Sequence, residues 1–324
     1  MTVVKDVYIS ATGCSSIRRV ETEESYSMIS ARATIECDAT TLTMGDTVTI
    51  DAGYADSHGV LFFGYVKRIE YVRPDNVIRI SCNDELVKAV DFFIAADDPE
   101  APFQRNNISS LNLVEDVLAL ASVTNVSGTE PGFTWGTNSD GVRFNLQTVA
   151  DAAQSIANIV GYTLYADKTG AVFFVARKPY VEEADTPSHT FSTGSSGNIV
   201  DITYSVSTDS TRNIIKVYGR NPITAQASGS NQYLVVDQTV VLAHEMIDSQ
   251  EIADGAASVN LALLNRLSES FEITVLGDKT VQAREIATVT DSWIGASARE
   301  VFIYRALHTI SESDGYQLNL TCIP

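Results

Sequence analysis

Few side chains in this sequence could carry chemistry, and their spacing matches no catalytic or metal-binding motif. The four histidines are His58, His189, His244 and His308. A zinc-binding helix places two histidines one turn apart, as in H-E-x-x-H, and no pair here has that spacing. Gly194-Ser195-Ser196-Gly197 has the composition of a loop and lacks the G-x-S-x-G pattern of a nucleophile elbow. Phosphate-binding and dinucleotide-binding fingerprints are also missing, so we expect no catalytic residue, no metal and no cofactor.

Two weaker arrangements leave alternative functions open. Glu245 and Asp248 could serve a cell-wall hydrolase, because glycosidases use a pair of carboxylates. With 41 acidic residues in the chain, such pairs also arise by chance. Trp135 and Trp293 fall in predicted loops, where they could stack on sugar in a carbohydrate-binding adhesin or anchor a loop in the core.

The charge of the chain is negative along its whole length. The net charge is −19, made up of −5, −7 and −7 for residues 1–95, 96–190 and 191–324. The excess therefore belongs to folded surfaces rather than to an acidic tail. Such surfaces repel nucleic acid and anionic membranes, which favours either simple solubility or a wall that DNA passes without sticking.

The four cysteines are scattered and form no C-x-x-C pair. Cys14, Cys37, Cys82 and Cys322 are expected to be reduced, and three of them end or punctuate strand-like runs. The N-terminal residues have no basic leader followed by an apolar segment, and no apolar run approaches the ~20 residues that span a bilayer. We therefore expect a reducing compartment and no membrane association.

The stretch from Gly45 to Cys82 organises the fold prediction. It alternates polar and apolar residues, as a half-buried strand does, and then runs into a longer apolar strand, a Pro-Asp-Asn turn and a return strand. Val60–Cys82 and Glu300–Cys322 are both 23 residues long and overlay without a gap as strand, turn and strand. This match predicts an internal duplication.

We expect a mainly β protein with an α/β insert. Residues 1–95 are predicted to form one small antiparallel β-barrel. Residues 96–190 are predicted to form an α/β module with linkers, and residues 191–324 a second β-barrel that carries a long helix at about 249–267.

Three segments together resemble the tail hub proteins of phages and contractile injection machines, a family that includes late-control tail proteins and the hub part of type VI secretion spikes. They are GDTVTIDAGYADSHGVLFFGYVKRIEY, DITYSVSTDSTRNIIKVYG, and the helix from Ser249 with FEITVLGD and VFIYRALHTISESDGYQLNL. In the last, His308, Ser311, Gly315 and Tyr316 stand at the family's motif positions. Gln282-Ala283-Arg284 departs from the Pro-Gly that usually precedes the Ile286 strand.

The resemblance implies a non-enzymatic virion protein of the tail baseplate. It implies a homotrimer, whose six barrels sit beneath a six-fold tail tube and above a spike, among other baseplate proteins and around passing DNA. Two apolar strand faces are expected at the subunit interface, because one small barrel cannot cover both. The residues expected there are Phe62, Phe63, Tyr65, Phe302, Ile303, Tyr304 and His308.

Overall fold

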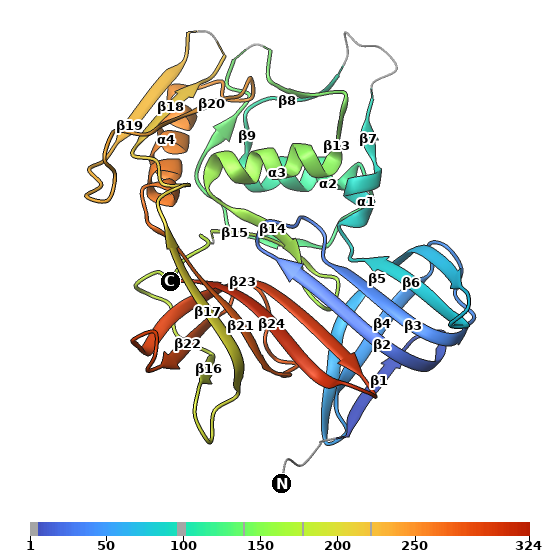
Figure 1. Ribbon diagram of the computed structural model, residues 1–324. Helices are drawn as coiled ribbons and strands as arrows, with labels where there is room; N and C mark the ends of the chain where they lie inside the picture. The colour runs from blue at the N-terminus through green and yellow to red at the C-terminus, as the bar shows by residue number, and fades with distance from the viewer. Residues whose placement is uncertain (1–5, 96–101, 139, 177, 221) are drawn as a thin grey trace.

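The computed structural model describes residues 6–95, 102–138, 140–176, 178–220 and 222–324. Two β units lie side by side, and a module of helices and short strands covers them (Figure 1). The chain is mainly β, which confirms the predicted fold class. We call the two β units unit 1 and unit 2, and the covering part the middle module.

Unit 1 is a six-stranded antiparallel sheet curled round one apolar core. Its strands are β1 (Val7–Ala11), β2 (Cys14–Ser25), β3 (Arg32–Thr40), β4 (Thr47–Tyr54), β5 (Ser57–Val72) and β6 (Val77–Asn83). Their order is β1-β4-β5-β6-β3-β2. Every strand contributes alternate apolar side chains to this core, as the period of two predicts.

Unit 2 has the same strand order. Its strands are β16 (His189–Ser192), β17 (Ile199–Ser207), β21 (Ser268–Leu276), β22 (Ile286–Asp291), β23 (Ala296–Ser311) and β24 (Gly315–Ile323), in the order β16-β22-β23-β24-β21-β17. Taken in chain order, each strand occupies the place of its counterpart in unit 1. One difference is that β16 runs parallel to β22, whereas β1 runs antiparallel to β4.

Irregularities in the ladders recur at the same places in both units. The β2–β3 ladder shifts between Ile17 and Arg19, and the β17–β21 ladder shifts between Ile199 and Asp201. The long hairpins shift likewise, at Val66/Arg68 and at Ile303/Arg305. Because bulges re-aim a strand at a defined residue, their recurrence supports the predicted duplication.

The ungapped overlay of the two hairpins is nevertheless wrong in its first strand. Val66 lies opposite Cys82 and Ile303 lies opposite Cys322, so Val66 corresponds to Ile303 rather than to Ala306. Beyond these pairs the unit 2 hairpin is three residues longer, because its two arms are longer. A shift by an odd number of residues moves a strand's side chains to the other face. Phe302 is accordingly buried away from the unit 2 core, edge-on to Tyr26.

The two units are joined through their backbones into one continuous sheet. β2 of unit 1 pairs antiparallel with the second half of β23 of unit 2, from Arg19 opposite Ser311 to Ser25 opposite Arg305. Among the described residues, the strands of the two units form one sheet of twelve strands. The units therefore cannot move independently without breaking ladder hydrogen bonds.

The middle module has a single core built from two separate stretches of chain. The first stretch supplies α1 (Val87–Asp91), β7 (Phe93–Ile94), β8 (Phe103–Arg105), β9 (Ile108–Ser109), α2 (Ser110–Ala119), β10 (Val126–Gly128), β11 (Thr134–Trp135), β12 (Val142–Phe144), β13 (Gln147–Thr148), α3 (Val149–Val160), β14 (Thr163–Ala166) and β15 (Val172–Val175). The second supplies β18 (Ile214–Tyr218), β19 (Thr224–Ser228), β20 (Thr239–Ala243) and α4 (Gln250–Leu264).

Local sequence explains the two longer helices. Thr148 caps α3 by accepting from the Asp151 amide, and Gly161 ends it in the left-handed conformation. Ser249 caps α4 by accepting from the Ile252 amide. None of the described helices combines the length and apolar character needed to cross a membrane.

The predicted domain boundaries need correction here. Ile215, Val217, Ile252 and Ala256 share one core with α2 and α3, so residues 214–264 pack with the middle module rather than with unit 2. The long helix of the predicted second barrel lies in an insertion between β17 and β21. Sequence periodicity found this helix but could not show which core its apolar face joins.

Candidate functional site

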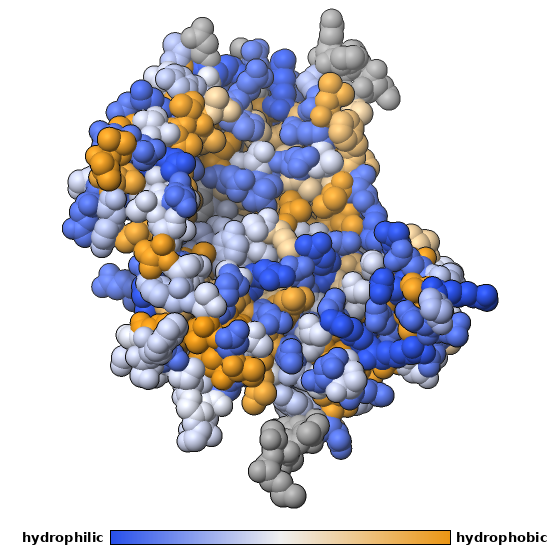
Figure 2. Space-filling view, viewed as in Figure 1, coloured by the Kyte–Doolittle hydropathy of each residue, from blue (hydrophilic) through white to orange (hydrophobic). Residues whose placement is uncertain are grey.

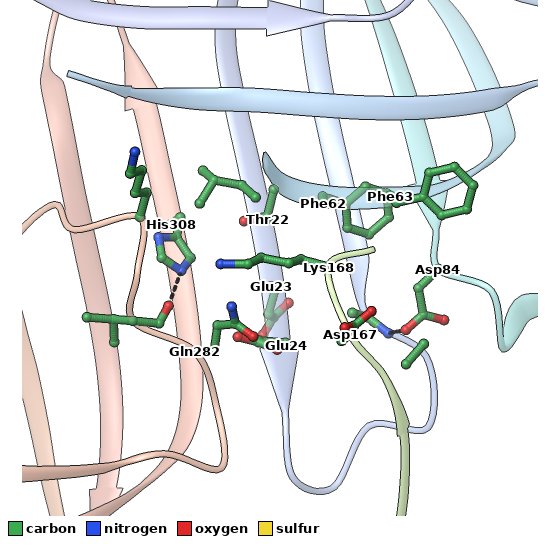
Figure 3. A pocket seen from close by; sticks show the side chains of 15 residues that line it. Thr22, Glu23, Glu24, Phe62, Phe63, Asp84, Asp167, Lys168, Gln282 and His308 are labelled. Atoms are coloured by element: carbon green, nitrogen blue, oxygen red, sulfur yellow. Dashed lines mark hydrogen bonds between the residues drawn. The ribbon is translucent and has the colours of Figure 1, made fainter. Parts of the chain in front are cut away.

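The three parts of the chain meet at a small polar pocket, which we call the junction (Figure 3). Unit 1 contributes Glu24 of β2 together with Asp84, unit 2 contributes Gln282 and His308, and the β14–β15 turn contributes Lys168. The pocket encloses about 20 Å³, which is room for about one water molecule. Its size excludes an organic substrate, so its side chains act on one another.

Arg284, which precedes β22, has the backbone conformation of a glycine. Its φ is +75°, in the left-handed region that side chains disfavour. Its amide donates to the Ile303 carbonyl, just as the amide of Gly45 donates to the Val66 carbonyl in unit 1. Gly45 has φ +86°. The sequence lacks the usual Pro-Gly before the Ile286 strand, yet the turn there is the same as the turn at Gly45 in unit 1. Arginine takes the place of glycine in unit 2.

The Arg284 side chain ties the three parts together. Its Nη2 donates to the Ser25 carbonyl oxygen of unit 1 at 2.7 Å, and its guanidinium lies 4.3 Å from the ring centre of Tyr165 in the middle module. Its Nη1 is 3.9 Å from a carboxylate oxygen of Glu24. The side chain is only 7% exposed, and its Nε has no hydrogen-bond partner among the described residues. These contacts hold the side chain in place, although burial lowers the pKa of its guanidinium.

Two carboxyl groups lie in the same region. Burial raises the pKa of Glu24 to about 7, against the opposing attraction of Arg284, and the Ala283 amide donates to it at 2.7 Å. Burial likewise raises the pKa of Asp84 to about 7, although Ser30 Oγ and the amides of Ala31 and Leu86 donate to it. Both groups therefore change charge near neutral pH.

His308 is neutral and fixed. Its Nδ1 is 2.7 Å from the Tyr316 hydroxyl and its Nε2 is 3.1 Å from the Val281 carbonyl oxygen. Burial lowers its pKa to about 4. Lys168 extends across the pocket beside it (Figure 3) and makes no hydrogen bond or ion pair within the described part of the chain.

The arrangement is that of a structural joint. No nucleophile is paired with a base at the junction, and the described residues hold no group of three metal-ligating side chains. Sequence reasoning missed Arg284, Glu24, Asp84 and Lys168 as members of one cluster. The signal for Arg284 was its place in a motif that usually carries glycine.

The seven residues expected at a subunit interface have partners inside the chain. Phe62, Phe302, Ile303 and His308 are at most 4% exposed, so they leave no surface for a second copy, and their placement at an interface is corrected. Phe63 packs on Gly170, Tyr65 donates to Glu85, and Tyr304 lies near the Tyr26 ring. The physical reason is that the middle module and the neighbouring unit cover the second strand face.

The two alternative sites are not assembled. Trp135 is fully buried and donates from Nε1 to Ser110 Oγ, so it anchors a loop and cannot bind sugar, whereas Trp293 is 89% exposed. Asp248 is buried and accepts from the Gly136 amide and from Asn138. Glu245 is exposed and makes no ion pair among the described residues.

Comparison with known proteins gives a likeness of fold. No protein-family model and no curated protein sequence matches the chain. A tail protein from Neisseria meningitidis MC58 superposes with a TM-score of 0.74 at 14% identity, over 98% of this chain and 96% of that one. The 43 kDa tail protein of prophage MuSo2 from Shewanella oneidensis gives 0.66 at 16% identity, over 98% of both chains.

A third structure extends the likeness to secretion machines. An E. coli component of the type VI secretion system, described as structurally similar to the T4 tail proteins gp27 and gp5, gives a TM-score of 0.55 at 10% identity. It is matched over 98% of this chain and 76% of that one. The resemblance stated from sequence is thus confirmed at the level of architecture: this chain has the fold of the phage tail and secretion-system hub proteins.

Proposed function

We propose that the chain is a structural subunit of a phage-type tail baseplate, a hub that forms a homotrimer between a tail tube and a spike. The observation that carries the proposal is the pair of units with one strand order and matching bulges. Three copies supply six similar units, which adapts a three-fold spike to a six-fold tube. Solved tail proteins with the same fold support this role.

The charge supports a conduit for DNA. Three copies carry about three times −19, and a negative wall lets DNA pass without binding. In this proposal the chain is not an enzyme, assembles in the bacterial cytoplasm and resides in the virion baseplate. Buried Trp135 weighs against the adhesin alternative, and buried Asp248 weighs against the hydrolase alternative.

Native mass spectrometry and electron microscopy of the purified protein test the proposal at two ionic strengths. We expect ring-shaped trimers that are more stable at moderate salt, because a Debye length of ~8 Å near 0.15 M screens the self-repulsion. A monomer at every concentration and salt, also with tube or spike protein added, would overturn the ring and reopen the adhesin alternative.

A further inference from the structure

The contact between the two units inside one chain is a template for a contact between chains. In that contact, the outer edge of β2 pairs with the second half of β23 over seven residue pairs, from Arg19–Ser311 to Ser25–Arg305. The first half of β23 is occupied on the same side by β22. A second contact of this kind therefore requires two strands. One stands in the place of β2 and has an unpaired edge. The other stands in the place of β23 and has its second half unpaired on the corresponding edge.

Each partner of the template has a counterpart in the other unit. β17 occupies the place of β2, and the matching bulges equate Ile17 with Ile199 and Thr22 with Tyr204. β5 occupies the place of β23, and its bulge equates Val66 with Ile303. The second half of β5 thus corresponds to the second half of β23 that pairs with β2.

Both counterparts are open in the single chain. Within the described residues, β17 pairs with β21 on one edge and has no strand on the other. β5 is paired by β4 up to Tyr65, and beyond the bulge its ladder partner is β6 alone. Open edges of this length invite strand addition, and soluble proteins normally cover or block them.

We propose that β17 of one copy pairs antiparallel with the second half of β5 of a second copy, in the register that β2 and β23 use within the chain. This inference rests on the proposed ring and names its interface. When the strands are aligned at their bulges, the register of the β2–β23 pair places Tyr204 opposite Tyr71, Ser205 opposite Glu70, and Val206 opposite Ile69. The pairs further along are Thr203 with Val72 and Ser207 with Arg68.

The chemistry of the facing residues suits this pairing. The transferred register sets no like charges opposite each other, and it brings together two tyrosines and two apolar side chains, which are favourable cross-strand pairs. Tyr71 is 77% exposed and Val206 is 50% exposed in the single chain. Gly45, the counterpart of Arg284, has no side chain, and no described atom lies within 4 Å of the place where a Cβ would stand, so this residue leaves the approach of the second copy open.

Other exposed apolar side chains gather at the same two sides of the molecule. On the β17 side, the insertion that follows it exposes Val235 and Val236. On the β5 side, Phe92, Phe93 and Leu146 are exposed near α1 and β7. Figure 1 places β17 to β20 and β5 to β7 at opposite sides, and Figure 2 shows apolar groups at both margins. The contact joins unlike surfaces, so it does not end at a dimer, and it closes a ring of three when each contact turns the next copy by a third of a full rotation.

Disulfide trapping tests the register in the full-length protein, in a Cys14→Ser background because Cys14 is the native cysteine that is not buried. Directly opposite residues of an antiparallel ladder have Cα atoms about 4.5–5.5 Å apart, within reach of a disulfide. The variant with Ser205→Cys and Glu70→Cys should form covalent dimers and trimers under mild oxidation. Mixing the two single variants should give covalent dimers only, since each copy then has half of one bond.

The matched control keeps the strands and shifts the register. Thr203→Cys with Arg68→Cys lies four residues out of register, about 13 Å along the strand, and should not crosslink. Trimers in native mass spectra without the Ser205–Glu70 crosslink, or with the shifted pair crosslinked instead, would overturn the strand pairing and leave the ring standing. A protein that stays monomeric in native mass spectra would overturn the ring and the pairing together.

Discussion

Replacing Arg284 with alanine should destabilise the joint between the three parts of the chain, and more strongly at alkaline than at acidic pH. The substitution removes the 2.7 Å bond to the Ser25 carbonyl and the stacking on Tyr165, and it retains the strained backbone. A hydrogen bond from a charged donor contributes ~1.5–3 kcal/mol and a desolvated cation–π contact ~2 kcal/mol. Part of this sum is offset because the buried guanidinium no longer needs to be desolvated.

The pH dependence follows from the carboxyl groups. The pKa of Glu24 is raised from 4.5 to about 7, so the folded chain binds a proton between these values that the unfolded chain has released, and stability falls as pH rises through this window. Asp84 contributes in the same direction. Each pKa unit corresponds to ~1.4 kcal/mol, so Glu24 alone accounts for at most ~3.5 kcal/mol.

Without Arg284, both carboxylates lose the cation that favours their charged forms. At pH 8 each carboxyl must then either ionise in a buried site without the cation or bind a proton against the high pH. Both cost free energy, and we expect a loss of ~3–5 kcal/mol, the range for breaking a buried ion pair. At pH 5.5 they can stay protonated, and we expect a loss of ~1–2 kcal/mol.

Urea unfolding of Arg284→Ala, Arg284→Gly and the parent at the two pH values measures these differences. The glycine variant should be more stable than the alanine variant by ~1 kcal/mol, because glycine adopts positive φ freely. Arg18→Ala is the matched control, since its ion pair with Asp38 is about half exposed and should be worth under ~1 kcal/mol at either pH. Equal losses at pH 5.5 and pH 8 for Arg284→Ala would refute the reasoning.

Two further predictions concern the core. Trp135→Phe should lower the free energy of unfolding by ~1–3 kcal/mol, because Ser110 loses a buried partner, whereas Trp293→Ala should change it by less than ~0.5 kcal/mol; urea titrations compare the two directly. Alkylation in the native state should modify Cys14 first, since burial raises the pKa of Cys37 and Cys82 to about 12, and alkylation after unfolding without reductant should label all four thiols in a mass spectrum. A persistent disulfide would contradict the expected reducing compartment.

Sequence patterns predicted much of the fold. Period-two alternation located the strands around Gly45–Cys82 and Glu300–Cys322, but it did not locate β2 or β16. The duplication was also visible, although the longer hairpin arms of unit 2 made the ungapped overlay place Phe302 on the wrong face. A shift by an odd number of residues leaves an apolar pattern intact when both faces are buried, so hydrophobicity alone could not reveal it.

The joint could not be predicted from the sequence. Glu24, Asp84, Lys168 and Arg284 are far apart in the chain, and with 41 acidic residues nothing distinguishes the two buried ones. The prediction that a second copy covers the second strand face was wrong for a related reason. Apolar residues on both faces require a covering layer, but the pattern does not say whether this layer is another copy or another part of the same chain.

The insertion of residues 208–267 between β17 and β21 has a consequence for biosynthesis. These 60 residues separate two strands that pair side by side. At a ribosomal rate of about 5–20 residues per second, β17 emerges ~3–12 s before its ladder partner. During that delay unit 1 is already complete in sequence, while unit 2 has only its first two strands. The nascent chain therefore passes through a stage in which β17 has neither β21 nor the proposed second copy beside it. A chaperone would protect this strand most at that stage.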